Sequence, residues 1–191
     1  GKRRPMGLVL ASTSPRRREL LSMIGALVEL EFPRVDESAF SAITAPDQLV
    51  VRLAEAKAQE VAGRRPDDVV IGADTVVVLD GEILGKPQDR EDARRMLGRL
   101  SGRTHQVWTG LAVIHRASGR AEVAAERTDV TFRELSQDEI DRYVQLGEGL
   151  DKAGAYAVQG VGALFVERLV GCYFNVVGLP LARLHSLLAR F

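Results

Sequence analysis

The residues from Ser12 to Arg18 offer the densest cluster of chemically useful side chains, with three hydroxyls, a proline and three consecutive arginines. Ser14 is a favourable helix N-cap and Pro15 suits the first helical position, so a turn entering a helix is predicted. Cations oppose the helix dipole in a first turn, which indicates that an anion is expected there. Free N–H groups, the hydroxyls of Ser12 and Ser14 and a guanidinium such as Arg16 would together bind a phosphate. A solvated turn is the alternative.

Three acids lie where they could perform chemistry. Asp74 stands in the middle of the apolar run Val69–Leu79, which predicts a strand covered on both faces. A carboxylate there must be paired, hydrogen-bonded or bound to a metal, because burying it bare is very costly. A carboxylate that caps a bulge is the other interpretation. Glu37 begins a polar loop, and Asp151 lies in a segment rich in glycine and alanine.

Three lysines could supply positive charge to the same chemistry. Lys57 falls on the apolar stripe of a predicted helix, where it either extends its amine to solvent or meets an anion. Lys86 lies on a loop between glycine and proline, and Lys152 follows Asp151. Acids that hold Mg²⁺ and orient water, with cations that neutralise phosphates, are typical of phosphate-ester or anhydride chemistry.

The elements that must position these side chains follow from hydrophobic periodicity and turn signals. The predicted strands are residues 8–11, 28–35, 69–79, 82–84, 106–115 and 121–135. The predicted helices are residues 15–24, 47–63 with Asp47 as cap, 89–100, 137–146 after a Ser136–Glu139 capping box, and 180–190. Near the end, a hairpin about Val170–Gly171 is expected to join strands 163–169 and 172–177. Asp80–Gly81 predicts a type I′ hairpin turn between strands 69–79 and 82–84, and Leu20, Leu21 and Ile24 are expected to form the apolar face of the first helix. An α/β fold is expected.

Composition limits the class of protein. A chain of 191 residues with 46% hydrophobic content can form one domain over residues 1–191, bent into two lobes around a cleft, with residues 1–7 as a disordered or loosely held start. Lys plus Arg (26) equals Asp plus Glu (26), so no overall field attracts nucleic acid or membrane. A single cysteine suits a reducing compartment, so cytoplasm is expected. The apolar run after residue 5 is too short for a signal peptide or a membrane span.

Several common site types are absent from the sequence. It contains no Walker A pattern, no Gly-x-Gly-x-x-Gly fingerprint and no Gly-x-Ser-x-Gly elbow, which argues against P-loop, Rossmann and α/β-hydrolase folds. The three histidines show no metal-ligand spacing with one another or with Cys172, so a zinc site is not expected.

Six ordered motifs resemble the Maf family of nucleoside triphosphate pyrophosphatases, and the similarity runs from Leu8 to Phe191. These motifs are residues 12–17 with 19–21, 72–75, 85–87, 100–102, 151–156 and 178–180. The resemblance implies an elongated α/β fold related to inosine triphosphate pyrophosphatases, with a mixed sheet bent around a central cleft. It also implies hydrolysis between the α and β phosphates, giving a monophosphate and pyrophosphate, with Mg²⁺ or Mn²⁺.

The resemblance also implies roles for individual residues. Asp74 would be the proton acceptor that activates water, and Glu37 with Asp74 would bind the metal. The residues implied in substrate binding are Ser12, Ser14, Arg16, Lys57, Thr75, Lys86, Asp151, Lys152 and Gln159.

Three positions indicate a branch of the family. Arg16, Thr75 and Gln159 are similar to the dTTP/UTP branch, whereas the 7-methyl-GTP branch tends to have Trp, Gln and Glu there. The chain departs mildly at Ala157–Val158, where that branch more often has Gly-Ile. Whether the target is a normal or a modified pyrimidine nucleotide stays open, as does a homodimer.

Two other function classes remain alternatives at this point. One is a nucleotide-binding regulator of septum formation and cell division with incidental catalysis, and the other is a phosphate-binding module without chemistry. Asp74 argues against a pure binder, because a buried acid beside a polyanion weakens binding by like-charge repulsion.

Overall fold

The computed structural model describes residues 7–191, which divide into two compact units. Unit 1 comprises Gly1–Asp74, Thr109–Glu126 and Gly178–Phe191, of which Gly7 is the first described residue. Unit 2 comprises Thr75–Trp108 and Arg127–Val177. The expected loose start at residues 1–7 and the signal-peptide question lie outside the described residues, except at Gly7. There the backbone N–H donates to Asp68 Oδ1 at 3.2 Å.

The strands form a seven-stranded mixed sheet in the order β2-β1-β3-β5-β6-β7, with β4 paired to β3. Their bounds are β1 (Leu8–Ala11), β2 (Glu29–Glu31), β3 (Val69–Leu79), β4 (Glu82–Leu84), β5 (Thr104–His115), β6 (Arg120–Phe132) and β7 (Val166–Val170). β1 is parallel to both β2 and β3, whereas the β3–β4 and β6–β7 pairs are antiparallel. This arrangement confirms the predicted α/β class.

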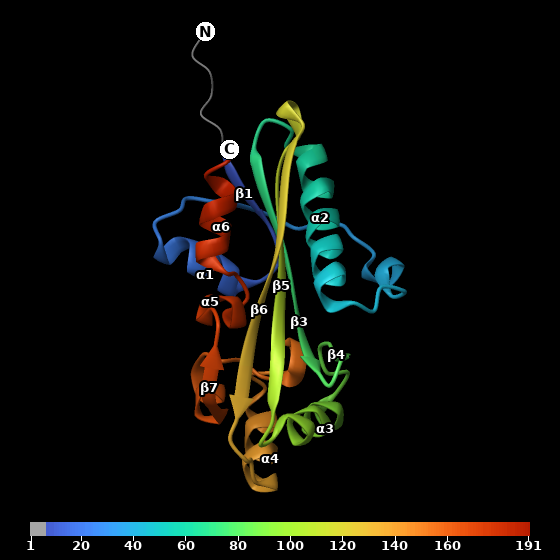
Figure 1. Ribbon diagram of the computed structural model, residues 1–191, viewed down its shortest axis with the longest axis vertical. Coiled ribbons are helices and arrows are strands. Elements are labelled where there is room, and N and C mark those ends of the chain that lie inside the picture. The colour runs from blue at the N-terminus through green and yellow to red at the C-terminus, as the bar shows by residue number, and fades with distance from the viewer. Residues whose placement is uncertain (1–6) are drawn as a thin grey trace. The chain divides into compact units, whose positions relative to one another are not determined.

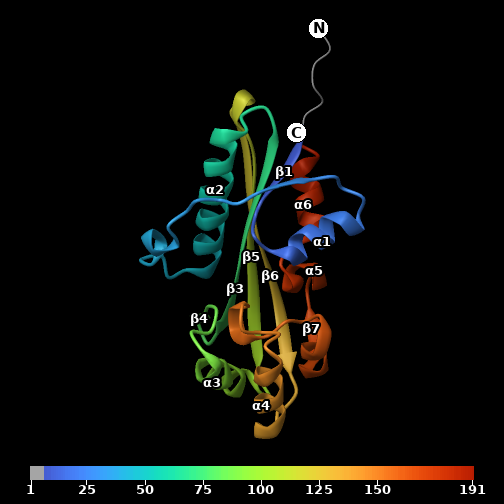
Figure 2. The same cartoon turned by 180° about the vertical axis from the view of Figure 1, so that it is seen from behind.

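Unit 1 sandwiches its strands between helices. α2 (Pro46–Arg64) covers one face, and α1 (Pro15–Met23) and α6 (Leu181–Leu188) cover the other (Figures 1 and 2). The contact between α2 and the sheet is very close, since a Cβ built on Gly72 would lie 2.2 Å from the backbone oxygen of Ala54. Small residues at Ala54 and Ala58 therefore let the helix approach β3 more closely than larger side chains would allow.

Unit 2 packs α3 (Arg90–Leu100) beside α4 (Gln137–Leu146), as Figure 1 shows. Its aromatic core contains Phe132, Tyr143, Tyr156 and Phe165 in edge-to-face contacts. The shorter elements are α5 (Tyr173–Val177) and 3₁₀ helices at Ala153–Ala155 and Gly160–Phe165. Over residues 7–191, no helix combines the length and apolarity that crossing a bilayer requires.

Several local predictions are confirmed. Ser14 caps α1 with Pro15 at its start, and β3 has the predicted bounds. The turn at Asp80–Gly81 has positive φ at both residues, +51° and +77°, as a type I′ hairpin requires. The Ser136–Glu139 capping box is present at the start of α4.

Other predictions are wrong in the N-terminal half. The strand expected over residues 28–35 is only Glu29–Glu31, because Pro33 has no N–H to continue a ladder. The cap of α2 is Ala45, not Asp47, since Pro46 takes the first helical position. Ile24 does not join the apolar face of α1 but is 53% exposed.

The expected hairpin about Val170–Gly171 is also wrong. β7 pairs with β6 instead of with the segment that follows it, and that segment is the helix α5. Asn175 in α5 donates from Nδ2 to the Val107 carbonyl at 3.1 Å and to Thr128 Oγ1 at 2.9 Å. A buried amide with two such partners fixes a helical turn where apolar pattern alone suggested a strand.

Candidate active site

The turn before α1 is built by its own hydroxyls. Ser12 Oγ accepts from the Ser14 backbone N–H at 3.1 Å, and Ser14 Oγ accepts from the Arg17 N–H at 3.4 Å. Ser12 is buried, Ser14 and Arg16 are partly exposed, and Arg18 is exposed. The turn predicted before the helix is therefore present, with Arg18 on its solvent-exposed side.

Arg17 is the residue of this turn whose importance sequence reasoning missed. Its Nε donates to the Gly178 carbonyl at 2.8 Å and its Nη1 to Ser12 Oγ at 3.2 Å. Desolvation lowers the pKa of its guanidinium, and the nearby negative charges of Asp74 and Glu37 act in the opposite direction. Arg17 thus places a positive charge close to both predicted metal ligands.

Helical spacing could have identified Arg17. It precedes the buried Leu20 and Leu21 by three and four positions, so it lies on the inward face of α1. Arg16 and Arg18 each have this relation to only one of the two leucines.

Lys57 joins the two predicted acids of unit 1. Its Nζ lies 2.8 Å from Asp74 Oδ1 and 3.0 Å from Glu37 Oε1. The side chains of Lys57 and Asp74 are only 15% and 13% exposed, whereas that of Glu37 is 60% exposed. Lys57 therefore meets an anion instead of extending to solvent, and Asp74 has the ion pair that its position in β3 requires.

Each member of this cluster comes from a different element. Asp74 is in β3, Lys57 is in α2 on the stripe of buried residues, and Glu37 begins a 3₁₀ helix (Glu37–Phe40) capped by Asp36. The close approach of α2 to β3 at Gly72 brings Lys57 to Asp74 across 17 positions of sequence.

The cluster is a cation position formed by two carboxylates. Over residues 7–191, no group of three or more Asp, Glu, His or Cys side chains could hold a metal. Glu37 and Asp74 nevertheless converge on one ammonium nitrogen, and carboxylate oxygens are ligands of the kind that a hard divalent cation prefers.

Unit 2 brings two of its predicted motifs together. The Gly154 backbone N–H donates to the Gly85 carbonyl at 3.1 Å, which places the loop of Lys86 beside the segment that begins with Asp151. Lys86 is exposed, and Lys152 Nζ lies 2.7 Å from Asp151 Oδ1. These charged groups are therefore at the surface of unit 2.

Thr75 and Gln159 belong to the same unit and lie in or next to regular secondary structure. Thr75 follows Asp74 in β3 and is partly exposed. Gln159 is also partly exposed and immediately precedes the 3₁₀ helix Gly160–Phe165. Of the predicted residues, unit 1 holds Ser12, Ser14, Arg16, Glu37, Lys57 and Asp74, and unit 2 holds Thr75, Lys86, Asp151, Lys152 and Gln159.

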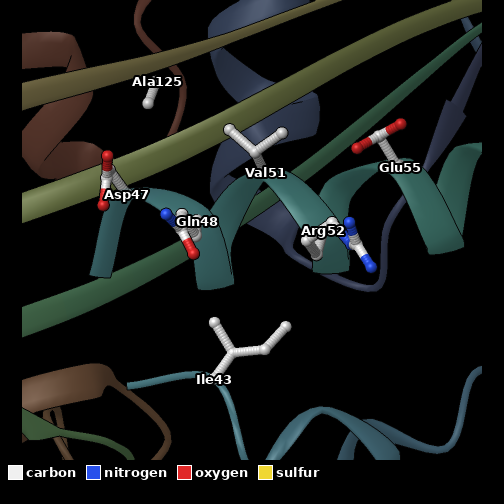
Figure 3. A pocket seen from close by; sticks show the side chains of 7 residues that line it. All are labelled: Ile43, Asp47, Gln48, Val51, Arg52, Glu55 and Ala125. Atoms are coloured by element: carbon white, nitrogen blue, oxygen red, sulfur yellow. The ribbon is translucent and has the colours of Figure 1, made fainter. Parts of the chain in front are cut away.

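A pocket on α2 is separate from these residues. It has a volume of about 480 Å³, and Figure 3 shows Val51 and Glu55 projecting from α2, with Ile43 and Ala125 contributed by other segments. Asp47, Gln48 and Arg52 also line it, and no predicted site residue does. Lys57 pairs with Asp74 and Glu37 and does not line the pocket, so this pocket is not the candidate site.

Comparison with known proteins identifies relatives that match nearly the whole chain. A dTTP/UTP pyrophosphatase of Pelotomaculum thermopropionicum is 53% identical over 184 residues, covering 96% of each chain. Those of Desulforamulus reducens and Moorella thermoacetica are 49% and 53% identical, covering 96% of this chain and 96% and 94% of theirs. A solved HAM1 protein from Coxiella burnetii aligns with 97% of this chain and 100% of its own, with 14% identity and a TM-score of 0.49. The model described as Maf-like protein matches residues 7–191, and the chain belongs to the Maf family.

Proposed function

We propose that this protein hydrolyses dTTP and UTP to the nucleoside monophosphate and pyrophosphate. The observation that carries the proposal is the convergence of Asp74 and Glu37 on Lys57 Nζ, in the same unit as the Ser12–Arg17 turn. A base, a cation position and an anion-binding turn are the parts that phosphoanhydride hydrolysis needs. The curated relatives named dTTP/UTP pyrophosphatase support the same reaction.

The turn before α1 receives phosphate oxygens. Backbone N–H groups at the helix start, the Ser14 hydroxyl and the partly exposed Arg16 offer hydrogen bonds and charge to them. Arg17, tied to Ser12 and Gly178, holds the turn in shape and adds positive charge near the acids.

Asp74 is the general base. Its position in the centre of a long strand fixes the carboxylate, and its pairing with Lys57 keeps it oriented before substrate binds. When a triphosphate brings its own negative charge, the Lys57 amine turns towards the phosphates, and Asp74 accepts a proton from the attacking water.

Glu37 and Asp74 would hold Mg²⁺ or Mn²⁺ together with phosphate oxygens. When bound, this metal neutralises charge on the phosphates and polarises them for attack. Two carboxylates supply too few ligands for a divalent cation by themselves, so we expect the metal to bind together with the nucleotide.

The predicted residues of unit 2 have side chains that suit nucleotide binding. Lys86 and Lys152 offer positive charge to phosphates, and Asp151 orients Lys152 through their ion pair. Gln159 offers the base an amide with a donor and an acceptor, which matches the carbonyl and N3–H groups of uracil or thymine. Thr75, which directly follows the general base Asp74 in β3, contributes to the choice of nucleotide.

Pyrophosphate release from dTTP, UTP, CTP and GTP tests the activity directly. Turnover in H₂¹⁸O locates the attack, because attack at the α-phosphorus places the label in the monophosphate and attack at the β-phosphorus places it in pyrophosphate. Labelled monophosphate with dTTP and UTP preferred is the expected result. Release of orthophosphate, or tight nucleotide binding without turnover, would contradict the proposal and favour a nucleotide-binding regulator.

A further inference from the structure

Glu148 makes an unusual pair of contacts in unit 2. It lies on the turn after α4, between two glycines, and both of its carboxylate oxygens accept backbone hydrogen bonds. Oε1 accepts from the Val161 N–H at 3.0 Å, and Oε2 accepts from the Gly162 N–H at 3.1 Å. These N–H groups belong to the first turn of the 3₁₀ helix Gly160–Phe165, where intrahelical partners are missing. Glu148 therefore caps this helix from a distant point in the sequence.

Gln159 occupies the position from which a helix is normally capped. A residue there usually turns its own side chain back to the free N–H groups of the first turn. Within residues 7–191, the Gln159 side chain makes no such capping hydrogen bond. Because Glu148 satisfies the N–H groups instead, the amide of Gln159 can direct its donor and acceptor elsewhere.

The fit between Glu148 and this segment depends on glycine. Gly160 has φ of +78°, and a Cβ built on it would lie 1.9 Å from Glu148 Oε1. No other residue would allow both this backbone conformation and this approach of the carboxylate. The Glu148 carboxylate therefore packs closely against the backbone at Gly160.

The residues before Gln159 are also anchored within unit 2. The Ala157 N–H donates to the Tyr143 hydroxyl at 3.0 Å, and the Tyr156 hydroxyl lies 2.6 Å from His105 Nε2. Tyr143, Tyr156 and His105 are all buried. Gln159 therefore stands on a segment held on both sides, which reduces the ordering that a ligand would have to impose.

We propose that Glu148 is a positioning residue for base selection, which caps the helix at Gly160 so that the amide of Gln159 is free to read the pyrimidine. The inference rests on the proposed function, in which Gln159 contacts the base. Glu148 itself touches neither the substrate nor the reacting atoms.

The Glu148→Gln variant tests the proposal with little change in size. Its carbonyl accepts one N–H, but its NH₂ group faces the other, so one contact becomes donor against donor. The ratio of kcat/KM for UTP to that for GTP is expected to fall about tenfold, chiefly through a higher KM for UTP. Glu167→Gln, an exposed carboxylate of β7 in the same unit, is the matched control and should leave the ratio unchanged.

A double-mutant cycle with Gln159→Ala separates positioning from general destabilisation. If Glu148 acts through Gln159, adding Glu148→Gln to Gln159→Ala costs no further selectivity. Independent, additive losses would overturn the proposal. If Gln159→Ala itself leaves selectivity unchanged, the base-reading role in the proposed function fails. If Gln159→Ala changes selectivity but Glu148→Gln does not, this inference fails while the proposed function stands.

Two further measurements keep the result interpretable if Glu148→Gln is less stable. Hydrogen exchange at the Val161 and Gly162 amides should become faster in the variant, while that of buried β3 amides should not. Gly160→Ala, which displaces the same carboxylate without altering it, should reproduce the loss of selectivity. Retained selectivity in Gly160→Ala together with faster exchange would show that the cap does not direct Gln159.

Discussion

The predicted functional residues of the two units lie in different structural surroundings. In unit 1, Asp74 lies on a long strand and Lys57 on a long helix, and each is mostly shielded and paired with the other. In unit 2, Lys86 and Asp151 are exposed on loops, and the partly exposed Gln159 immediately precedes a short 3₁₀ helix. Chemistry at a phosphorus atom needs fixed geometry, whereas holding charge at a surface does not. Changes in unit 1 should therefore reduce kcat, and changes in unit 2 should alter KM or selectivity.

The largest effect is expected from Asp74→Asn. Asparagine fills the same space but does not accept the proton of water, so kcat should fall about 1,000-fold while nucleotide binding remains measurable. Steady-state kinetics and calorimetric binding of UTP give the two quantities. Asp80→Asn, in the β3–β4 turn of unit 2, is the control and should keep near-normal turnover. Near-normal turnover in Asp74→Asn would show that another group is the base.

The core of unit 2 should respond to acid through His105. Burial lowers the pKa of this histidine from 6.5 to about 4, and its Nδ1 has no hydrogen-bond partner among the described residues. Between these values the unfolded chain binds the extra proton and the folded chain does not, so stability falls as pH decreases from about 6.5 to about 4. The total loss should be about 3 kcal/mol.

Urea unfolding of wild type and His105→Gln across this range measures the effect. Glutamine keeps a partner for the Tyr156 hydroxyl but does not titrate, so the variant should lose most of the pH dependence. His185→Gln, on the exposed side of α6, should keep it. An unchanged pH profile in His105→Gln would locate the acid sensitivity elsewhere.

The three arginines of α1 should differ in their effect on kcat/KM according to the direction in which each side chain faces. Arg17→Ala removes hydrogen bonds to Gly178 and Ser12 and a charge near the acids, so kcat/KM should fall about 10- to 100-fold. Arg18→Ala removes an exposed side chain and should change kcat/KM less than about twofold. The loss of kcat/KM in Arg16→Ala should lie between those of the other two variants. Equal losses for Arg17 and Arg18 would mean that the turn does not bind phosphate in the way described.

The lysines compare the two units directly. Lys57→Ala leaves Asp74 without its ion-pair partner, so kcat should fall about tenfold or more. Lys86→Ala removes only an exposed charge, so KM for UTP should rise several-fold with kcat nearly unchanged, an effect that is larger at low salt. If both variants changed kcat and KM in the same way, the two units would not differ in their contribution to catalysis and binding.

Gln159→Glu is expected to change selectivity and not turnover of the preferred substrate class as a whole. A carboxylate only accepts hydrogen bonds, so it meets a pyrimidine carbonyl without a donor, at a cost of about 1–3 kcal/mol. Guanine presents N–H donors and should be tolerated better. Comparison of kcat/KM for dTTP, UTP, CTP and GTP on both proteins checks this. An unchanged ranking would place selectivity elsewhere.

Much of the local structure was predictable because it depends on neighbouring residues. The Ser14 cap with Pro15, the β3 strand and the Asp80–Gly81 turn all follow from short-range signals, and all are present. The error at the expected C-terminal hairpin arose where distant partners decide. α5 is a helix because Asn175 bonds to Val107 and Thr128, and no local pattern reports those partners.

The sequence by itself determined which residue types could do the chemistry, and its ordered motifs indicated the family. The tertiary structure alone decided which of them meet. Lys57 reaches Asp74 because Gly72 lets α2 pack against β3, and Glu148 reaches Val161 because Gly160 leaves room for its carboxylate. Arg17, rather than Arg16, joins Ser12 because α1 turns that face inward. Such contacts depend on close packing between segments far apart in the chain, which periodicity and spacing do not encode.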